Sequence, residues 1–214
     1  MPIEITLRTK GSTSPFRNRL KWLCSLPVGD RLILCSGYFQ EKNYKGGYSI
    51  LNDDLLKAIQ KSGKITSIEI VGLMGSIHKS KGIRNFHNSL RSAGFRVDIF
   101  QPLNHKWHAK IAIRVDKDTP LIAIIGSSNL TRPPYGITTK SDWNYECDVT
   151  MWDDSRVSIR DFLESEDERA INRVEEFILT TDLIDSGQPS ISDRLNQLLS
   201  EIRGNVSDLN GFAE

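Results

Sequence analysis

Two neighbouring segments decide the fold of this chain: WHAKIAI at residues 107–113 and LIAIIGSSN at residues 121–129. In the first, His108 and Lys110 alternate with apolar residues. A period of two places both polar side chains on one face of a strand and the apolar ones on the other. The second segment is a nearly continuous apolar run, typical of a fully buried strand, and it ends in a small polar turn. We therefore expect two strands whose ends carry polar groups.

These polar groups suit the binding of a phosphate. Lys110 supplies a positive charge, while Asn129 and the Gly126-Ser127 turn supply hydrogen-bond donors. His108 supplies a nucleophile or a proton. A strand histidine alone is more often an ordinary residue with a satisfied partner, so the hypothesis depends on the whole set occurring together.

Strands and helices alternate over most of the chain. Apolar runs and alternating patterns predict an edge strand at 2–8 and further strands at 31–39, 65–73, 95–101 and 145–152. Helical periodicity and end signals predict helices after Ser14-Pro15 and at about 53–62, 80–93, 156–164, 167–180 and 190–203. This order predicts an α/β sandwich with a mixed, mostly parallel sheet. We expect a catalytic domain over 1–185, with the C-terminal helix and tail, 186–214, as part of the same domain.

Composition indicates an ordinary globular protein of 214 residues. No stretch approaches the roughly 18 apolar residues of a membrane span, and the first residues show no signal peptide, so we expect a cytoplasmic protein without membrane contact. The cysteines, Cys24, Cys35 and Cys147, are far apart in apolar or strand-like contexts, which favours buried reduced thiols over a metal site.

The net charge of +1 hides a strong asymmetry. Residues 1–140 hold 22 Lys and Arg against 9 Asp and Glu, whereas residues 141–214 hold 6 against 18. A basic segment around the candidate site favours a polyanionic substrate, nucleic acid above all. The alternative is a solvated surface on which charges segregate by chance. Likewise, the acidic region 153–185 is either a solvated helical face or a competitor of DNA for the basic groove.

The order of the polar residues resembles the phospholipase D superfamily, whose signature is H-x-K-x4-D-x6-G-S-x-N with an acidic residue downstream. Here it reads His108-x-Lys110, Gly126-Ser127-x-Asn129 and then Asn144-Tyr145-Glu146. The resemblance covers about residues 28–152. It implies a phospholipase D-like α-β-α sandwich and a phosphodiester-cleaving enzyme.

One position departs from that signature. The family's Asp falls on Val115, with Asp116 one place later on the opposite face of the strand. A branch of metal-independent restriction endonucleases in the superfamily is more similar, because its members also lack that Asp and place a Glu after the G-S-x-N turn. The role of the acidic site residue is therefore carried to Glu146.

The resemblance also implies a mechanism. His108 attacks phosphorus and forms a covalent phosphohistidine, while Lys110 and Asn129 bind the non-bridging oxygens. The Gly126-Ser127 turn helps to hold the phosphate, and Glu146 hydrogen-bonds a histidine ring nitrogen. A second histidine must protonate the leaving oxygen. Since one H-x-K motif is present, we expect a homodimer with the site at its two-fold interface, and no metal or cofactor.

Other residues are weaker candidates for substrate contact. They are His78, Lys79, His105, Trp107 and Arg132, each of which is also explained as a loop, surface or packing residue. Trp107 and Trp143 suit core packing somewhat better than stacking on a base.

The sequence therefore predicts a DNA endonuclease. Restriction or defence is its expected setting, and target recognition comes from its own loops, comes from a partner protein, or does not exist. The alternatives are a hydrolase of phospholipids or other small phosphodiesters, and a nucleic-acid-binding module with a decayed site.

Overall fold

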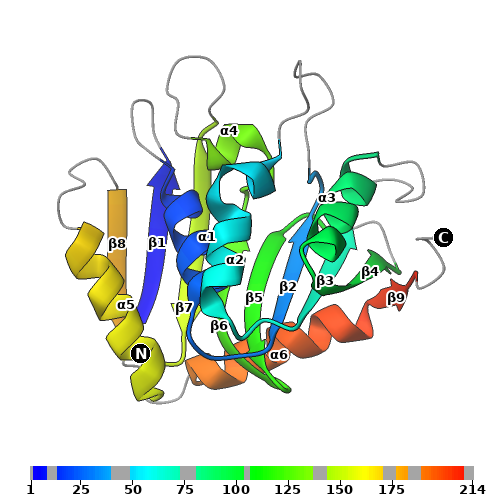
Figure 1. Ribbon diagram of the computed structural model, residues 1–214. Coiled ribbons are helices and arrows are strands. Elements are labelled where there is room, and N and C mark those ends of the chain that lie inside the picture. The colour runs from blue at the N-terminus through cyan, green and yellow to red at the C-terminus, as the bar shows by residue number, and fades with distance from the viewer. Residues whose placement is uncertain are drawn as a thin grey trace.

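A computed structural model describes residues 2–8, 14–39, 49–72, 81–103, 107–136, 144–170, 177–182 and 189–209. Its centre is a nine-stranded sheet with the strand order β8-β1-β7-β6-β5-β2-β3-β4-β9 (Figure 1). The strands are β1 Pro2–Arg8, β2 Arg31–Ser36, β3 Ser67–Gly72, β4 Arg96–Pro102, β5 Lys110–Asp116, β6 Thr119–Gly126, β7 Glu146–Trp152, β8 Phe177–Asp182 and β9 Val206–Asp208.

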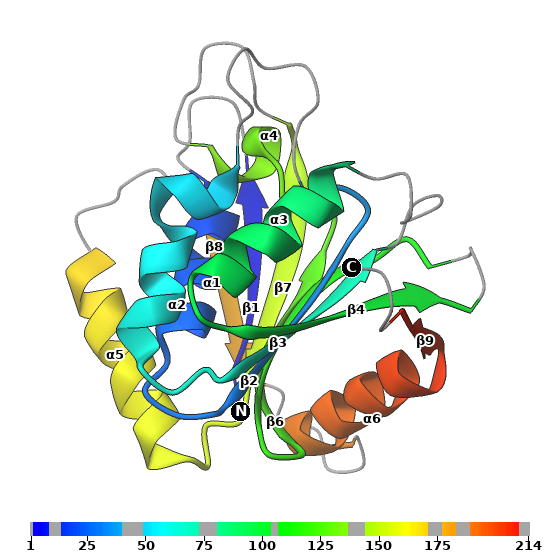
Figure 2. The ribbon, with the colours of Figure 1, turned by 45° about the vertical axis from the view of Figure 1, so that its right-hand side comes forward.

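Helices cover both faces of the sheet, so the molecule has three layers (Figure 2). One face carries α1 Pro15–Ser25, α2 Leu56–Ser62 with the π-helical turn Leu51–Leu55 before it, α3 Lys81–Ser92 and α5 Val157–Ala170. The other face carries α6 Ile191–Gly204. The short α4, Arg132–Tyr135, lies at one edge of the sheet (Figure 1). An apolar cluster fills each interface, which explains why β5 and β6 are buried on both sides.

Local signals set the helix ends. The hydroxyl of Ser14 accepts the N–H of Arg17 at 3.1 Å, and Pro15 begins α1. Gly63, at φ 60°, ends α2 in the left-handed conformation that glycine adopts most easily. Ser190 and Asp193 form a capping box at the start of α6.

The α/β architecture with a mixed sheet agrees with the sequence, but the expectation of a mostly parallel sheet is wrong. Only β2–β3 and β3–β4 are parallel pairs among the described strands. The other six neighbouring pairs are antiparallel. The reason lies in the connections. β5 and β6 form a hairpin through Lys117-Asp118, and β7 returns alongside β6. Among the described helices, only α2 and α3 connect a strand to its neighbour in the sheet as parallel crossovers, whereas α1 and α5 connect strands that are not neighbours.

Three other predictions are wrong. The segment 2–8 is no edge strand, because β1 pairs with β7 on one side and β8 on the other. The helix expected at 167–180 does not exist as such, since α5 runs on to Ala170 and residues 177–182 form β8. Cys147 is exposed, whereas Cys24 and Cys35 are buried free thiols as expected. No helix in the described ranges combines the length and apolar character of a bilayer span.

Arg114 of β5 is fully buried beneath α1 and α2. Its guanidinium donates to the carbonyls of Leu26 (3.2 Å) and Val28 (3.0 Å) and to the hydroxyl of Ser62 (2.6 Å). Burial lowers the pKa of Arg114 to about 10, although the neighbouring Cys24 and Asp30 oppose this shift. One side chain thus joins the end of α1 and the end of α2 to the sheet.

We expect Arg114→Ala to lower the free energy of unfolding by about 3 kcal/mol or more, since three buried acceptors lose their donor. Urea denaturation measures the change. Arg96→Ala is the matched control, because this strand arginine is 76% exposed and its pair with Asp98 contributes about 1 kcal/mol at most. Equal losses in the two variants would contradict the structural role of Arg114.

Candidate active site

The predicted site residues meet at one edge of the sheet, where β2 and β6 end and β5 and β7 begin. The register places Lys110 opposite Gly126, and Gly126 opposite Asp148. Arg8 at the end of β1 lies opposite Glu146. Paired positions in antiparallel strands point to the same face. The polar groups therefore form a row on the face that carries α1, α2, α3 and α5.

His108 directly precedes β5, two residues from Lys110, and its side chain is exposed. Its Nδ1 lies 3.5 Å from the Nζ of Lys110. This distance is at the long limit of a hydrogen bond, so the contact holds neither group tightly. Both side chains can therefore turn to a bound phosphate.

Ser36, at the end of β2, supports Asn129. Its hydroxyl lies 3.3 Å from the Oδ1 of Asn129 and accepts the backbone N–H of Leu130 at 3.1 Å. A contact through the amide oxygen leaves the NH2 group of Asn129 as the side that can donate to a ligand. These contacts fix the turn that carries Asn129 to the end of β2.

Asp148 holds the turn from below. The N–H of Ser128 donates to Oδ1 at 3.2 Å, and its hydroxyl donates to Oδ2 at 2.6 Å. Asp148 comes so close that a Cβ on Gly126 would lie 2.0 Å from Oδ1 and 2.6 Å from the carbonyl oxygen of Cys147. Glycine at position 126 is therefore required for the approach of the carboxylate.

Burial raises the pKa of Asp148 to about 6, and the nearby charge of Glu146 acts in the same direction. The hydrogen bonds from Ser128 and from the backbone of Ser127 oppose that shift. The buried carboxyl thus ionises near neutral pH, directly beneath the turn.

Glu146 is buried and faces the turn rather than His108. Its Oε2 accepts the hydroxyl of Ser127, and its Oε1 accepts the side-chain NH2 of Asn144 at 3.3 Å. No hydrogen bond joins it to His108 in the described part of the chain. The expected Glu–His contact is therefore not formed with His108 of the same chain. The Ser127 hydroxyl also accepts the N–H of Cys147 at 3.1 Å, which ties the turn to β7.

Arg8 fixes the segment that follows the turn. Its guanidinium, 2% exposed, donates to the carbonyl of Pro133 and, at 3.1 Å, to that of Gly136. Burial lowers the pKa of Arg8, and the charge of Glu146 partly offsets this. Ser14 adds a third bond, from its hydroxyl to the carbonyl of Pro134. The start of the chain thus holds α4 beside the candidate site.

The weaker candidates lie apart or outside the described ranges. Trp107 packs against the apolar cluster beneath α6, on the face opposite His108 and Lys110. Arg132 begins α4, three residues after Asn129. His78, Lys79 and His105, as well as Trp143, lie outside the described residues.

Position 115, where the phospholipase D signature has its Asp, lies at the other end of β5 from the candidate site. Val115 is fully buried in the α6-side cluster at the other end of β5, and Asp116 beside it lies 3.5 Å from Arg156. Neither residue contributes to the row of polar groups. Within the described ranges, no three His, Cys, Asp or Glu side chains gather as a potential metal site.

Sequence reasoning misses three supporting residues: Ser36, Arg8 and Asp148. For Asp148 and Arg8, the sequence contains a pattern that could have identified them. Asp148 follows Glu146 at a spacing of two, and Arg8 follows Thr6 in the same way, so each extends a polar face of a strand. The apolar residues of β1 suggest that their own side of the strand is the buried one, but Glu4, Thr6 and Arg8 are buried more deeply.

We expect Gly126→Ala to destabilise the protein by about 2 kcal/mol, because the methyl group forces Asp148 or β7 to move. The same change should disorder the turn, which a loss of amide-exchange protection at Ser127 and Ser128 would report. Gly204→Ala at the end of α6 is the control, since a Cβ added there would meet no atom within 4 Å. If both variants unfold at the wild-type urea concentration, the close approach of Asp148 is incorrect.

Asp148 should make stability depend on pH. Its pKa is raised in the folded state, so the folded protein keeps this proton longer than the unfolded chain does. Through this group alone, the free energy of unfolding should be highest below about pH 4 and fall by about 3 kcal/mol in total as pH rises through about 6. Urea titrations of Asp148→Asn should lack that fall. Asp118→Asn, at an 81% exposed carboxylate, should keep it. Parallel pH profiles for wild type and Asp148→Asn would refute the assignment.

No protein-family model and no curated protein matches this chain. Several solved structures are similar to it at low identity. The polyphosphate kinase of Porphyromonas gingivalis is 16% identical with a TM-score of 0.46, over 78% of this chain and 26% of the kinase. NucT of Helicobacter pylori is 15% identical with a TM-score of 0.41, over 82% of this chain and 99% of NucT. Yeast tyrosyl-DNA phosphodiesterase is 14% identical with a TM-score of 0.45, over 70% of this chain and 46% of the yeast enzyme. The chain thus spans less than half of the kinase and of the yeast enzyme, and its function has to be inferred from the site itself.

Proposed function

We propose that this chain is a phosphodiesterase of the phospholipase D type that cleaves DNA without a metal ion. The observation that carries the proposal is the position of His108 and Lys110 at one sheet edge, in register with the turn that carries Asn129, whose side-chain NH2 group is left to donate. A nucleophile, a cation and oriented donors are the groups that a phosphoryl transfer needs.

The reaction has two displacements. In the first, a ring nitrogen of His108 attacks phosphorus, the bond from phosphorus to the leaving oxygen breaks, and that oxygen takes a proton. In the second, water attacks the phosphohistidine, gives up a proton and releases a phosphate monoester together with the free imidazole. Lys110 and the NH2 group of Asn129 bind the non-bridging oxygens, on which negative charge increases in each transition state.

The leaving oxygen needs an acid that one chain does not supply from its described residues. Only His87 and His108 are histidines in those ranges, and His87 is buried in α3 beside Asn88. A second copy of the chain would bring its own His108 to the same phosphate. The proposal therefore includes a homodimer with a shared site, in which Glu146 hydrogen-bonds the ring of the partner histidine.

DNA is the proposed substrate because much of the chain around the site is positively charged. His108, Lys110 and Asn129 belong to the basic first 140 residues of the sequence, which suits a polyanion, whereas Glu146 and Asp148 of β7 come from the acidic part. Restriction or defence is the proposed setting, in keeping with the resemblance of the site motif to metal-independent restriction endonucleases.

We expect purified protein to nick supercoiled plasmid DNA in excess EDTA, and His108→Ala to reduce the rate at least about 1000-fold, since no residual nucleophile remains. Lys117→Ala, prepared in the same way, controls for contaminating nucleases, because Lys117 lies in the hairpin at the other end of β5. Acid-labile 32P on the wild-type protein after a quench would identify the phosphohistidine. Cleavage that requires metal or survives in His108→Ala would refute the mechanism.

The shared site has its own test. Sedimentation should give twice the mass of one chain, and wild type mixed with excess His108→Ala should lose activity as mixed dimers form. A fully active monomer would leave the nuclease proposal standing and remove the dimer from it.

A further inference from the structure

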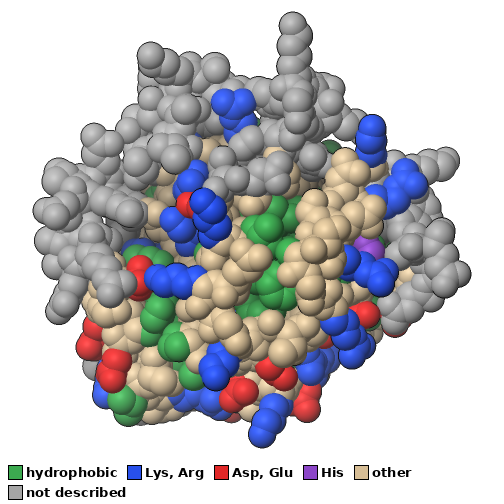
Figure 3. All heavy atoms as spheres, viewed as in Figure 1, with side chains coloured by type: hydrophobic (Ala, Val, Ile, Leu, Met, Phe, Trp, Pro, Cys, Tyr) green, Lys and Arg blue, Asp and Glu red, His purple; other side chains and the backbone are tan. Residues whose placement is uncertain are grey.

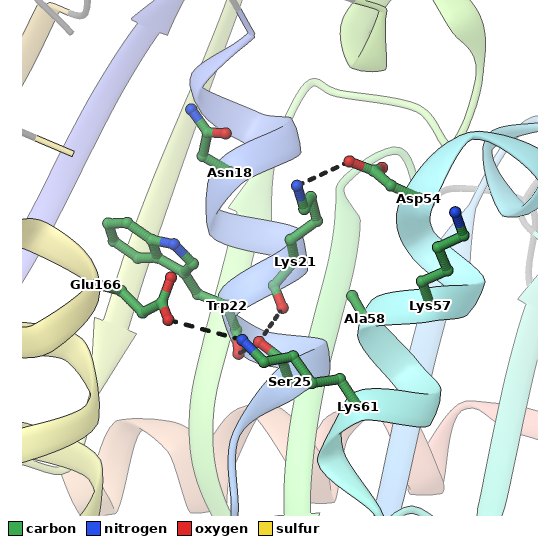
Figure 4. A pocket seen from close by; sticks show the side chains of 9 residues that line it. All are labelled: Asn18, Lys21, Trp22, Ser25, Asp54, Lys57, Ala58, Lys61 and Glu166. Carbon is green, nitrogen blue, oxygen red and sulfur yellow. Dashed lines mark hydrogen bonds and ion pairs between the residues drawn. The ribbon is translucent and has the colours of Figure 1, made fainter. Parts of the chain in front are cut away.

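A basic groove separate from the site lies between α1, α2 and α5 and holds about 290 Å³ (Figure 4). Lys21 comes from α1, Lys57 and Lys61 come from α2, and Glu166 comes from α5. Trp22 forms part of its wall, with the guanidinium of Arg19 at 3.8 Å from the ring centroid. Three ammonium groups thus line one opening on the helical face.

Helical spacing places these lysines in a line. Lys57 and Lys61 are four residues apart, so they lie along one side of α2, and Asp54 lies in the π-helical turn before it. At 1.5 Å per residue, Lys61 lies about 6 Å further along α2 than Lys57. In the space-filling view, basic side chains gather over α1 and α2 around an acidic one (Figure 3).

The two carboxylates of the groove engage its lysines unequally. Asp54 contacts Lys21 at 2.7 Å and Arg17 at 2.8 Å. Burial would raise the pKa of Asp54, but hydrogen bonds from Lys21, Tyr135 and Arg17 outweigh it and lower the pKa. Asp54 is therefore a fixed anion of the protein that holds Lys21 in place.

Lys57 and Lys61 are held far less tightly. Lys61 is 65% exposed and reaches Glu166 only at 4.0 Å, a distance at which a surface pair contributes little. Lys57 is exposed, so a surface pair at this position would contribute little. Both ammonium groups can accept a phosphate without the loss of a strong contact.

Asp54 also links the groove to the candidate site. It accepts the hydroxyl of Tyr135 at 2.5 Å, and the guanidinium of Arg17 lies 4.9 Å from the centre of that ring. Tyr135 ends α4, six residues after Asn129. The groove therefore begins at the segment that leaves the phosphate-binding turn.

We infer that Lys57 and Lys61 bind backbone phosphates of a DNA strand that continues beyond the scissile phosphate, along the groove between α1 and α2. This inference rests on the proposed function, which supplies the strand. The ligand chemistry is a run of phosphodiesters. With about 3.4 Å of duplex per phosphate of one strand, the two lysines are about two phosphates apart.

The test compares a short and a long ligand. Lys57→Gln/Lys61→Gln removes two charges and keeps the side-chain stems. The control pair, Lys64→Gln/Lys117→Gln, removes two exposed charges at the opposite end of the sheet, near Asp30. Each pair is assayed for hydrolysis of bis(4-nitrophenyl) phosphate, which reaches only the site. In a His108→Ala background, anisotropy measures the binding of a labelled DNA hairpin with a stem of about 20 base pairs.

We expect the groove pair to bind the hairpin about tenfold more weakly at 0.1 M salt, with a salt dependence shallower by about two contacts. Its kcat/KM for the small diester should equal that of wild type, and the control pair should match wild type in both assays. Equal losses in the two pairs, or equal losses on both ligands, would overturn the inference.

Two further outcomes are distinguishable. If the groove pair loses affinity for inorganic pyrophosphate but not for the hairpin, the groove serves a separate phosphate ligand and the inference is wrong. If wild type hydrolyses neither ligand, the proposed function fails, while the anisotropy comparison still decides whether the groove binds DNA.

Discussion

The carboxylate of Asp148 beneath the Gly126–Asn129 turn is the contact on which the candidate site depends. It accepts both donors of Ser128, and it comes so close to the turn that only glycine fits at 126. Burying this carboxylate is unfavourable in itself, as its raised pKa shows. The burial is kept because the hydrogen bonds from Ser128 to Asp148 fix the Gly126–Asn129 turn. That turn presents Asn129 at the edge where His108 and Lys110 lie.

Much of this edge is predictable because strand periodicity is a local property. The alternation in 107–113 and the apolar run before Gly126 predict two adjacent strands and the meeting of His108, Lys110 and Asn129, which the register of β5 and β6 provides. The residues that support these three side chains are not predictable from the sequence. Ser36 and Arg8 are distant in sequence and reach the site only through the strand order of the sheet. No local pattern specifies that order.

The errors in the fold have the same origin. A strand followed by a helix suggests a parallel crossover, and this holds for β2, β3 and β4. The expectation of a parallel crossover fails where strands meet through hairpins or through long connections, as for β5 to β8. In the segment Phe177–Asp182, the acidic helix before it suggests that the helix continues, whereas pairing with β1 makes it a strand. The residues Phe-Ile-Leu-Thr-Thr themselves favour a strand, so local β propensity and the pairing with β1 agree against the continued helical pattern.

The place of β1 between β7 and β8 has a consequence for how the molecule folds. Residues 2–8 are made before the strands they pair with, yet Thr6 donates to the carbonyl of Asp148, 142 residues away, and the other edge of β1 bonds to residues 177–182. Contacts so distant in sequence form slowly, because a long loop must close before they stabilise anything. The hairpin of β5 and β6 can form early, but α4 receives the support of Arg8 only when β1 has entered the sheet. A folding chain therefore has its histidine and lysine in place before the segment beside them is secured, and the site matures as one of the last parts of the fold.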